Sequence, residues 1–315
     1  MLVRGIERRV PSAIIEEEQV LLKHPAHGRM IPQHEMLHNQ ANGREATAVV
    51  NGVRLAYEMS GTGDIPLVMV HGSWLNRRNW DFAVPRLADS FRVLTYDRRG
   101  HGESERPSGQ GSVRENVADL AALIEHLGLV PAWVAGSSFG GSITLRLAGK
   151  RPDLLRGITA HEPPLFSLAA TDPAVAPMIE EDMRSDAAAA ERIASGDHAG
   201  AAEQFAEALQ PGLWTEFPPE IRQAMIENAP AFLDEANDPD FYAFDLEWIR
   251  DFPHPALLTQ GDQSPPQYAA VIPKLAEALP SVEVRTVTGV GHAAHVEDPE
   301  AYVKAVTAFV RRHTA

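Results

Sequence analysis

The sequence predicts an α/β protein: a doubly wound, mostly parallel sheet that helices cover on both faces, with a helical cap inserted into it. Short apolar runs typical of buried strands alternate with segments whose apolar residues recur at helical spacing, over 47–160 and again over 256–311. Between them, from 163 to 250, the alternation stops and the chain is rich in Ala, Glu and Asp. We therefore expect four parts: an N-terminal arm (1–45), a first part of the core (46–162), the cap (163–250) and a second part of the core (251–315).

The first part of the core begins with a β-hairpin over 47–61, because Asn51-Gly52 lies between two β-rich runs and favours a tight turn. The run PLVMV at 66–70 is fully apolar, as expected for a strand buried on both faces. The other elements expected before the cap are helices over 80–88, 113–127 and 138–150 and strands over 91–96, 132–135 and 155–160.

The cap is expected to consist of helices, which we place at 187–195, 201–209 and 219–228. The sheet then resumes. For this second part of the core we expect strands over 256–259 and 282–287 and helices over 268–279 and 299–311.

Composition restricts the classes of function. With 44% hydrophobic and 23% charged residues, the 315-residue chain is typical of a globular protein with a full core. Its formal net charge of -15 repels phosphate backbones and anionic headgroups, so we expect neither nucleic acid nor a membrane surface as a partner. The absence of cysteine excludes disulfides, a thiol nucleophile and thiolate metal ligands. Because we find no signal peptide and no membrane-spanning run, we expect a cytoplasmic protein acting on a neutral small molecule.

The N-terminal arm lacks the strand and helix periodicity of the rest of the chain. A short helix is expected over 14–22, and His24, His27, His34 and His38 are scattered through polar sequence. Their spacings match no compact ligand pattern, so we expect no metal site there. A solvated arm that could pack on a neighbouring subunit of a homo-oligomer is the better interpretation.

The segment 136–140 reads GSSFG and lies between an apolar strand and a helix. In a G-x-S-x-G sequence the turn from strand into helix is so tight that the residues two before and two after the serine must lack bulky side chains. Ser138 has glycine at both of these distances, whereas Ser137 does not. We therefore expect Ser138 to be a nucleophile whose oxyanion benefits from the helix N-terminus.

The segment 71–74 reads HGSW and follows the apolar strand at 66–70. A loop at this point can direct the backbone N–H of Ser73 to the place that the N–H of Phe139 reaches, and two such donors form an oxyanion hole. We expect His71, inside the turn, to hold the loop.

The segment 289–292 reads GVGH and follows the last strand, so a histidine comes after the serine in chain order. The glycines leave this loop free to fold back over the serine. His292 is therefore the expected general base, with His295 as a nearby alternative.

These three segments, together with YDRRGHGES at 96–104, resemble the α/β-hydrolase family over about 47–315, in its serine hydrolase branch. Each motif stands at the C-terminal edge of its strand and in the family's order. The resemblance implies an eight-stranded sheet with a cap after the sixth strand, where the helical segment lies here.

The third catalytic residue departs from the usual pattern. The family acid normally follows the seventh strand in a Gly-x-x-Asp sequence, but here 261–264 reads GDQS, which puts Ser264 at that position and Asp262 two residues early. The alternative is Glu162, in the HEPP segment at 161–164 after the sixth strand. Zearalenone lactonases and one group of haloalkane dehalogenases are similar in placing a catalytic glutamate there. We favour Glu162, with Asp262 as the alternative, as the group that stabilises the His292 imidazolium.

The expected activity is hydrolysis of a carboxylic ester or lactone through an acyl-enzyme on Ser138, with no metal or organic cofactor. C–C bond hydrolases and cofactor-free perhydrolases share the triad and stay open as alternatives, as does a ligand-binding protein that has kept the fold. For substrate binding we expect Trp74 beside the oxyanion loop and Trp214 and Phe166 in the cap, although aromatic residues in a cap often form its own core.

Overall fold

The computed structural model of the protein describes residues 21–23, 30–32, 43–209 and 211–314. Its centre is an eight-stranded sheet in the order β10-β9-β8-β7-β5-β6-β4-β3, in which only the β3–β4 and β4–β6 pairs are antiparallel. The predicted doubly wound, mostly parallel sheet is confirmed. Its strands are β3 (Arg44–Val50), β4 (Val53–Ser60), β5 (Pro66–Val70), β6 (Arg92–Tyr96), β7 (Ala132–Ser137), β8 (Leu155–His161), β9 (Ala256–Gly261) and β10 (Val282–Val287).

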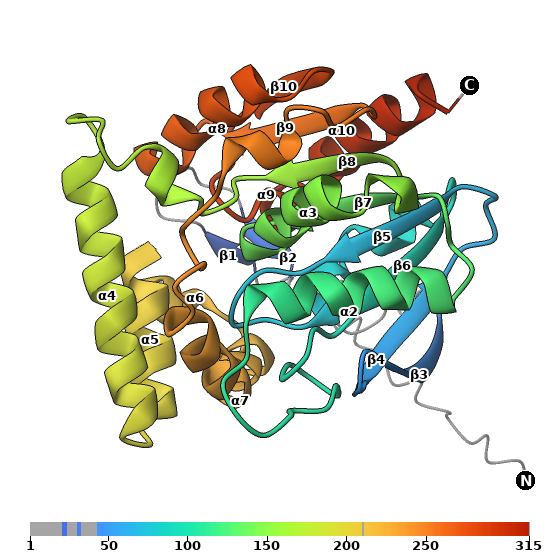
Figure 1. The fold of residues 1–315 in the computed structure, drawn as a ribbon. Helices are drawn as coiled ribbons and strands as arrows, with labels where there is room; N and C mark the ends of the chain where they lie inside the picture. The colour runs from blue at the N-terminus through green and yellow to red at the C-terminus, as the bar shows by residue number, and fades with distance from the viewer. Residues whose placement is uncertain (1–20, 24–29, 33–42, 210, 315) are drawn as a thin grey trace, which may run out of the picture.

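Helices cover both faces of this sheet (Figure 1). On one face, α2 (Val113–His126), α3 (Phe139–Lys150) and α8 (Pro266–Ala278) pack on the larger apolar cluster. On the other face, α1 (Val84–Leu87), α9 (Ala294–Glu297) and α10 (Pro299–Arg312) contribute to the second cluster. Every residue of β5 is buried, as expected for a strand between two helical layers.

The cap lies between the neighbouring strands β8 and β9 and forms a separate group of helices in Figure 1. It contains α4 (Ala176–Ala194), α5 (His198–Leu209), α6 (Leu213–Glu216) and α7 (Pro219–Ala236), with short 3-10 turns η3 (Phe166–Leu168) and η4 (Leu246–Ile249) at its ends. The start predicted for the first cap helix, at 187, is wrong, since α4 begins at Ala176. The apolar face of its first turns cannot be recognised in the sequence because Met178 and Met183 are apolar but exposed. The end predicted for α7 is also too early, since the helix continues through Pro230.

Two other expected helices differ from the structure. Over 80–88 the chain forms the 3-10 helix η1 (Arg77–Trp80) and then α1, because Pro85 has no N–H and can only occupy the first turn of a helix. The helix expected over 14–22 lies outside the described residues except at its end. There Leu21 and Leu22 belong to β1 (Leu21–Lys23), which pairs with β2 (Met30–Pro32). In the part of the chain that the structure describes, no helix is long and apolar enough to cross a membrane.

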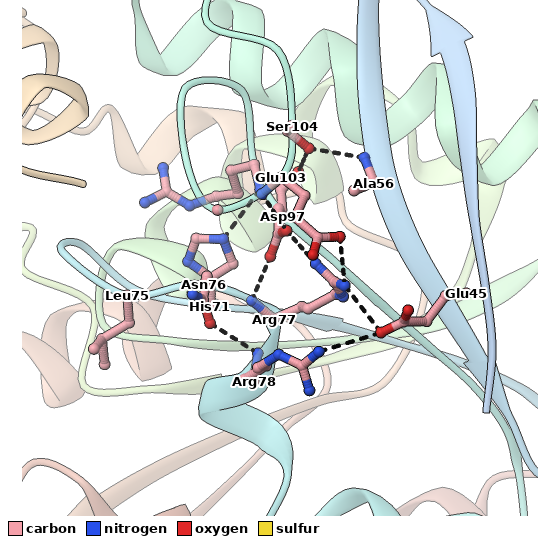
Figure 2. A network of polar contacts seen from close by, with 12 residues as sticks. Glu45, Ala56, His71, Leu75, Asn76, Arg77, Arg78, Asp97, Glu103 and Ser104 are labelled. Carbon is pink, nitrogen blue, oxygen red and sulfur yellow. Dashed lines mark hydrogen bonds and ion pairs between the residues drawn. The ribbon is translucent and has the colours of Figure 1, made fainter. Parts of the chain in front are cut away.

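A buried ion pair joins the loops that follow β5 and β6 (Figure 2). The Arg77 side chain is only 4% exposed and contacts Asp97, whose side chain is completely buried. Asp97 also accepts the backbone N–H groups of Arg77 at 2.7 Å and of Glu103 at 2.9 Å. The same guanidinium reaches Glu45 at 3.2 Å and Glu103 at 2.9 Å. The two loops are therefore fixed relative to each other at the edge of the sheet.

We expect Asp97→Ala to lower the free energy of unfolding by about 3–5 kcal/mol, because it removes the buried carboxylate and leaves the Arg77 guanidinium with only the exposed Glu45 and Glu103 as partners. Urea denaturation measures this change. The matched control is Asp153→Ala, which removes the exposed ion pair with Arg151 and should barely move the midpoint. Equal midpoints for the two variants would contradict a structural role for the buried pair.

Candidate active site

The candidate residues lie at the carboxyl ends of neighbouring strands. Because β5, β7, β8, β9 and β10 are consecutive in the sheet, the segments that follow them share one edge. Ser73 lies in the loop after β5, Ser138 follows β7, Glu162 follows β8, and His292 lies in the loop after β10. Ligands of open parallel sheets bind at this edge.

Ser138 occupies a strained turn between β7 and α3, with φ 54 and ψ -125. A Cβ at Gly136 would lie 2.2 Å from the Gly140 carbonyl oxygen, and one at Gly140 would lie 2.1 Å from that of Val70. Both glycines are therefore required by close backbone contacts. The Ser138 N–H donates to the His161 carbonyl at 2.8 Å, which ties the turn to β8.

Glu162 and His292 form a hydrogen-bonded pair. The His292 Nδ1 lies 2.7 Å from Glu162 Oε2, and the Gly261 N–H donates to Glu162 Oε1 at 2.8 Å. The Glu162 side chain is fully buried, whereas that of His292 is 18% exposed. Because Nδ1 faces the carboxylate, Nε2 is the His292 nitrogen left to act on a serine hydroxyl.

The pKa of Glu162 is held at about 2: burial of the carboxyl favours its neutral form, but the hydrogen bond from His292 and the neighbouring His161 and His292 rings outweigh it. The carboxylate is thus ionised at neutral pH. Burial lowers the pKa of His161 to about 4, so that ring is neutral. His161 Nε2 lies 3.1 Å from the His292 carbonyl oxygen and Nδ1 lies 3.0 Å from the Thr259 hydroxyl, so the ring supports the His292 loop.

Asp262, the alternative acid, is exposed and accepts the Gly289 N–H at 2.6 Å, so its contact is with the loop after β10. Ser264, at the usual acid position, has a buried hydroxyl. His295, the alternative base, is buried beneath Trp80, with 4.5 Å between the ring centroids. The structure therefore brings Glu162, and not Asp262, to the His292 ring.

The loop after β5 passes close to the serine, since a Cβ at Gly72 would lie 3.1 Å from Ser138 Cβ. The Gly72 carbonyl accepts from Arg98 Nη2 at 2.8 Å and from His71 Nδ1 at 2.8 Å. The Gly72 carbonyl and the Ser73 N–H belong to one planar peptide unit. The bonds that fix the carbonyl therefore also fix the N–H, which points in the opposite direction. His71 Nε2 accepts the backbone N–H of Arg98 at 3.0 Å. Burial lowers the pKa of His71, so the ring is neutral while it makes these two hydrogen bonds.

Three residues that sequence reasoning missed connect the cap to this loop. The buried Arg98 guanidinium pairs with Glu235 of α7 at 2.7 Å and lies 5.1 Å from the centroid of the Phe139 ring. Asn228, also on α7, donates to the Trp74 carbonyl at 3.1 Å. Arg98 lies within the conspicuous segment 96–104, but no local pattern marks Glu235 or Asn228 because their partners are distant in sequence.

Of the aromatic residues expected to bind substrate, Trp74 is completely buried and stacks on Phe232 of α7, with ring centroids 4.3 Å apart. Phe166 is also buried, and its ring contacts Tyr268 at 5.2 Å. Tyr268 in turn lies 4.2 Å from the His292 ring, which sequence reasoning had missed. Trp214 is partly exposed on α6, where Arg222 lies 5.9 Å from its ring.

The backbone is strained at several of these positions. Four described non-glycine residues have positive φ: Asn51 in the predicted hairpin turn, and Trp74, Ser138 and Glu162 at the candidate site. Such conformations cost about 1–3 kcal/mol each and are typical of functional sites. Within the described ranges, no three His, Asp or Glu side chains are grouped as a metal ion would require.

Comparisons with known proteins give the family. The model of the alpha/beta hydrolase fold matches residues 65–299. The acetyltransferase component of the acetoin cleaving system of Pseudomonas putida (dihydrolipoyllysine-residue acetyltransferase) is 30% identical over 87% of this chain and 72% of its own. A non-heme chloroperoxidase of Streptomyces lividans is 30% identical over 83% of this chain and 97% of its own. The structure of a thermophilic esterase from Thermogutta terrifontis matches with a TM-score of 0.69 and 26% identity, over 86% of this chain and all of that one.

The family model covers most of the described core. The names of the two relatives above state different activities. The sheet order, the cap after β8 and the serine turn after β7 agree with the family model. This chain therefore belongs to the α/β-hydrolase fold family.

Proposed function

We propose that the protein is a serine hydrolase that cleaves a carboxylic ester or lactone through an acyl-enzyme on Ser138. The observation that carries the proposal is the ionised, buried Glu162 at 2.7 Å from His292 Nδ1, next to a serine in a strained strand-to-helix turn. A carboxylate in this place selects the histidine tautomer whose Nε2 can accept a proton, which is the requirement for activating a serine hydroxyl.

In the proposed mechanism, Ser138 Oγ attacks the carbonyl carbon while His292 Nε2 takes the hydroxyl proton. Glu162 stabilises the imidazolium, and the N–H groups of Phe139 and Ser73 bind the oxyanion. The proton then passes from His292 to the leaving oxygen, so that an alcohol departs, or stays attached when the substrate is a lactone. Water, activated by the same histidine, releases the acyl group.

The same three side chains would also serve C–C bond hydrolysis or perhydrolysis, so the substrate must be found by experiment. A screen of p-nitrophenyl esters of increasing acyl length, together with lactones, tests the proposal directly. A fluorophosphonate probe separates turnover from simple ligand binding, because only an activated serine is labelled. Absence of both hydrolysis and labelling would favour a binding protein.

Ser138→Ala and His292→Ala should each reduce ester hydrolysis by more than about 1,000-fold, because members of a triad act as a unit. Circular dichroism should show an unchanged fold. Ser137→Ala is the matched control: it removes the adjacent hydroxyl and should keep fluorophosphonate labelling. Labelling that persists in Ser138→Ala would refute the assignment of the nucleophile.

Glu162→Gln should cut kcat by at least about 100-fold, since an amide cannot neutralise the imidazolium. A glutamine oxygen can still accept the Gly261 N–H, which now bonds to Glu162 Oε1, so the fold should be retained. Asp262→Asn should cost much less, because Asp262 accepts hydrogen bonds from Gly289 and Gln263 and not from His292. A larger loss in Asp262→Asn than in Glu162→Gln would exclude Glu162 as the acid.

Arg98→Met should lower kcat by about 10- to 100-fold with little change in KM, because the Gly72–Ser73 peptide loses the guanidinium that orients it towards the transition state. The single variant also leaves Glu235 buried without its cation. The double variant Arg98→Met/Glu235→Gln therefore serves as a control, in which thermal stability should recover while kcat stays low. Recovery of kcat together with stability would show that Arg98 acts on folding alone.

A further inference from the structure

The imidazole of His292 has an aromatic ring against its face. The centroid of the Tyr268 ring lies 4.2 Å from that of His292, and the two planes are inclined by only 33°. Among the described residues, the other ring near His292 is that of His161, at 6.2 Å. Tyr268 is 7% exposed, so its ring is almost completely withdrawn from solvent. The candidate general base therefore borders directly on a buried aromatic face.

Tyr268 is fixed from three directions. It lies in the first turn of α8, where its N–H donates to the Pro265 carbonyl at 3.2 Å. The preceding residue, Gln267, ties this turn to the cap, since its Nε2 donates to Asp182 of α4 at 2.7 Å. The Phe166 ring contacts the Tyr268 ring at 5.2 Å, with the planes 65° apart. These contacts leave the Tyr268 ring little room to move away from His292.

The chemistry of the Tyr268 side chain suits a neighbouring cation. Burial raises the pKa of the Tyr268 hydroxyl well above its usual range, and the carboxylates of Asp182, Asp186 and Glu162 act in the same direction. The phenol is therefore uncharged, and what it offers to His292 is the negative potential of its ring face. A cation against such a face is attracted to it, most strongly where water is excluded.

The hydrogen bond to Glu162 holds the His292 ring at one edge only. Nδ1 lies 2.7 Å from Glu162 Oε2, but the torsion that rotates an imidazole about its bond to Cβ has a broad energy minimum. A tilt about this edge would move Nε2 relative to the Ser138 hydroxyl. The Tyr268 ring lies against the imidazole face, where it limits such a tilt.

From this geometry we infer that Tyr268 is a positioning residue, whose ring holds the His292 imidazole in the plane needed for proton transfer and stabilises the imidazolium that forms when Ser138 attacks. The inference rests on the proposed function, because it concerns the general base of the same site. The ring carries the effect, and the hydroxyl is not required.

The kinetic test separates the ring from the hydroxyl. Tyr268→Phe keeps the ring, so kcat for a hydrolysed p-nitrophenyl ester should stay within about twofold of wild type. Tyr268→Met fills much of the same volume without an aromatic face and should lower kcat about tenfold, with KM changed less than about twofold. Tyr268→Leu gives the same comparison if the methionine variant does not fold. Equal kcat values for the phenylalanine and methionine variants would overturn the inference.

The matched control is Phe252→Met. Phe252 is 2% exposed and belongs to the same apolar cluster as Tyr268, but its ring partner is His254, at 5.5 Å. Its replacement should lower thermal stability and leave kcat within about twofold of wild type. A loss of kcat as large as that in Tyr268→Met would show that the loss follows from core packing alone, and would also overturn the inference.

NMR of the histidine rings tests the inference without any substrate. In protein labelled with 13C at histidine Cε1, the His292 signal is identified by its absence from His292→Ala. The pH at which this ring titrates should be lower in Tyr268→Met than in wild type and Tyr268→Phe, by about half a pH unit or more, because the lost ring face favours the charged form.

The other titratable groups that face His292 are unchanged in these variants. They are Glu162 and His161 at the end of β8, Asp182 on α4, and His295 and Glu297 on α9. If no ester is hydrolysed but the titration differs as expected, the role of Tyr268 at His292 stands and the proposed hydrolysis falls. Titration at the same pH in all three proteins, or at a higher pH in Tyr268→Met, would overturn the inference and leave the proposed hydrolysis standing.

Discussion

The hydrogen bond from His292 Nδ1 to the Glu162 carboxylate joins the end of β8 to the loop after β10 across the intervening strand β9, beside the bond from His161 Nε2 to the His292 carbonyl. Glu162 makes its bond to His292 with a φ of 42, which is unfavourable for a residue with a side chain. Two bonds to β9 hold the residue in this conformation: its N–H donates to the Thr259 carbonyl at 3.2 Å, and its Oε1 accepts the Gly261 N–H. These two bonds to β9 therefore offset the backbone strain at Glu162.

Helix α7 of the cap is connected by hydrogen bonds and an ion pair to the segment that is expected to bind the oxyanion. Glu235 forms an ion pair with Arg98, Arg98 donates to the Gly72 carbonyl, and Asn228 donates to the Trp74 carbonyl. Asn228 also accepts the Gly102 N–H at 2.9 Å, which extends the contact to the loop after β6. A displacement of α7 would be transmitted to the candidate oxyanion hole through these bonds.

The sheet could be predicted from sequence because each strand is a local apolar run, and the Ser138 turn because its glycines are local too. Glu162 could be proposed because Ser264 breaks the usual pattern and because the HEPP segment resembles that of relatives with a glutamate after the sixth strand. Its contact with His292 spans 130 residues and had no local signal. The partners of Arg98, Asn228 and Glu235 had no local signal, since packing of the cap on the core decides them. The first turns of α4 were missed because Met178 and Met183 lie on its exposed side, where a polar residue is expected.

The order of the strands has a consequence for synthesis of the protein. β9 and β10 follow the cap in the chain, so the serine turn and Glu162 leave the ribosome long before His292 does. Until β9 arrives, β8 is an open edge of the sheet, with backbone groups free to pair with other chains. At this stage six of the eight strands, β3 to β8, have been made, together with Ser138 and Glu162 but without His292. The open edge of β8 is therefore a surface prone to aggregation until the strands that follow the cap have been made.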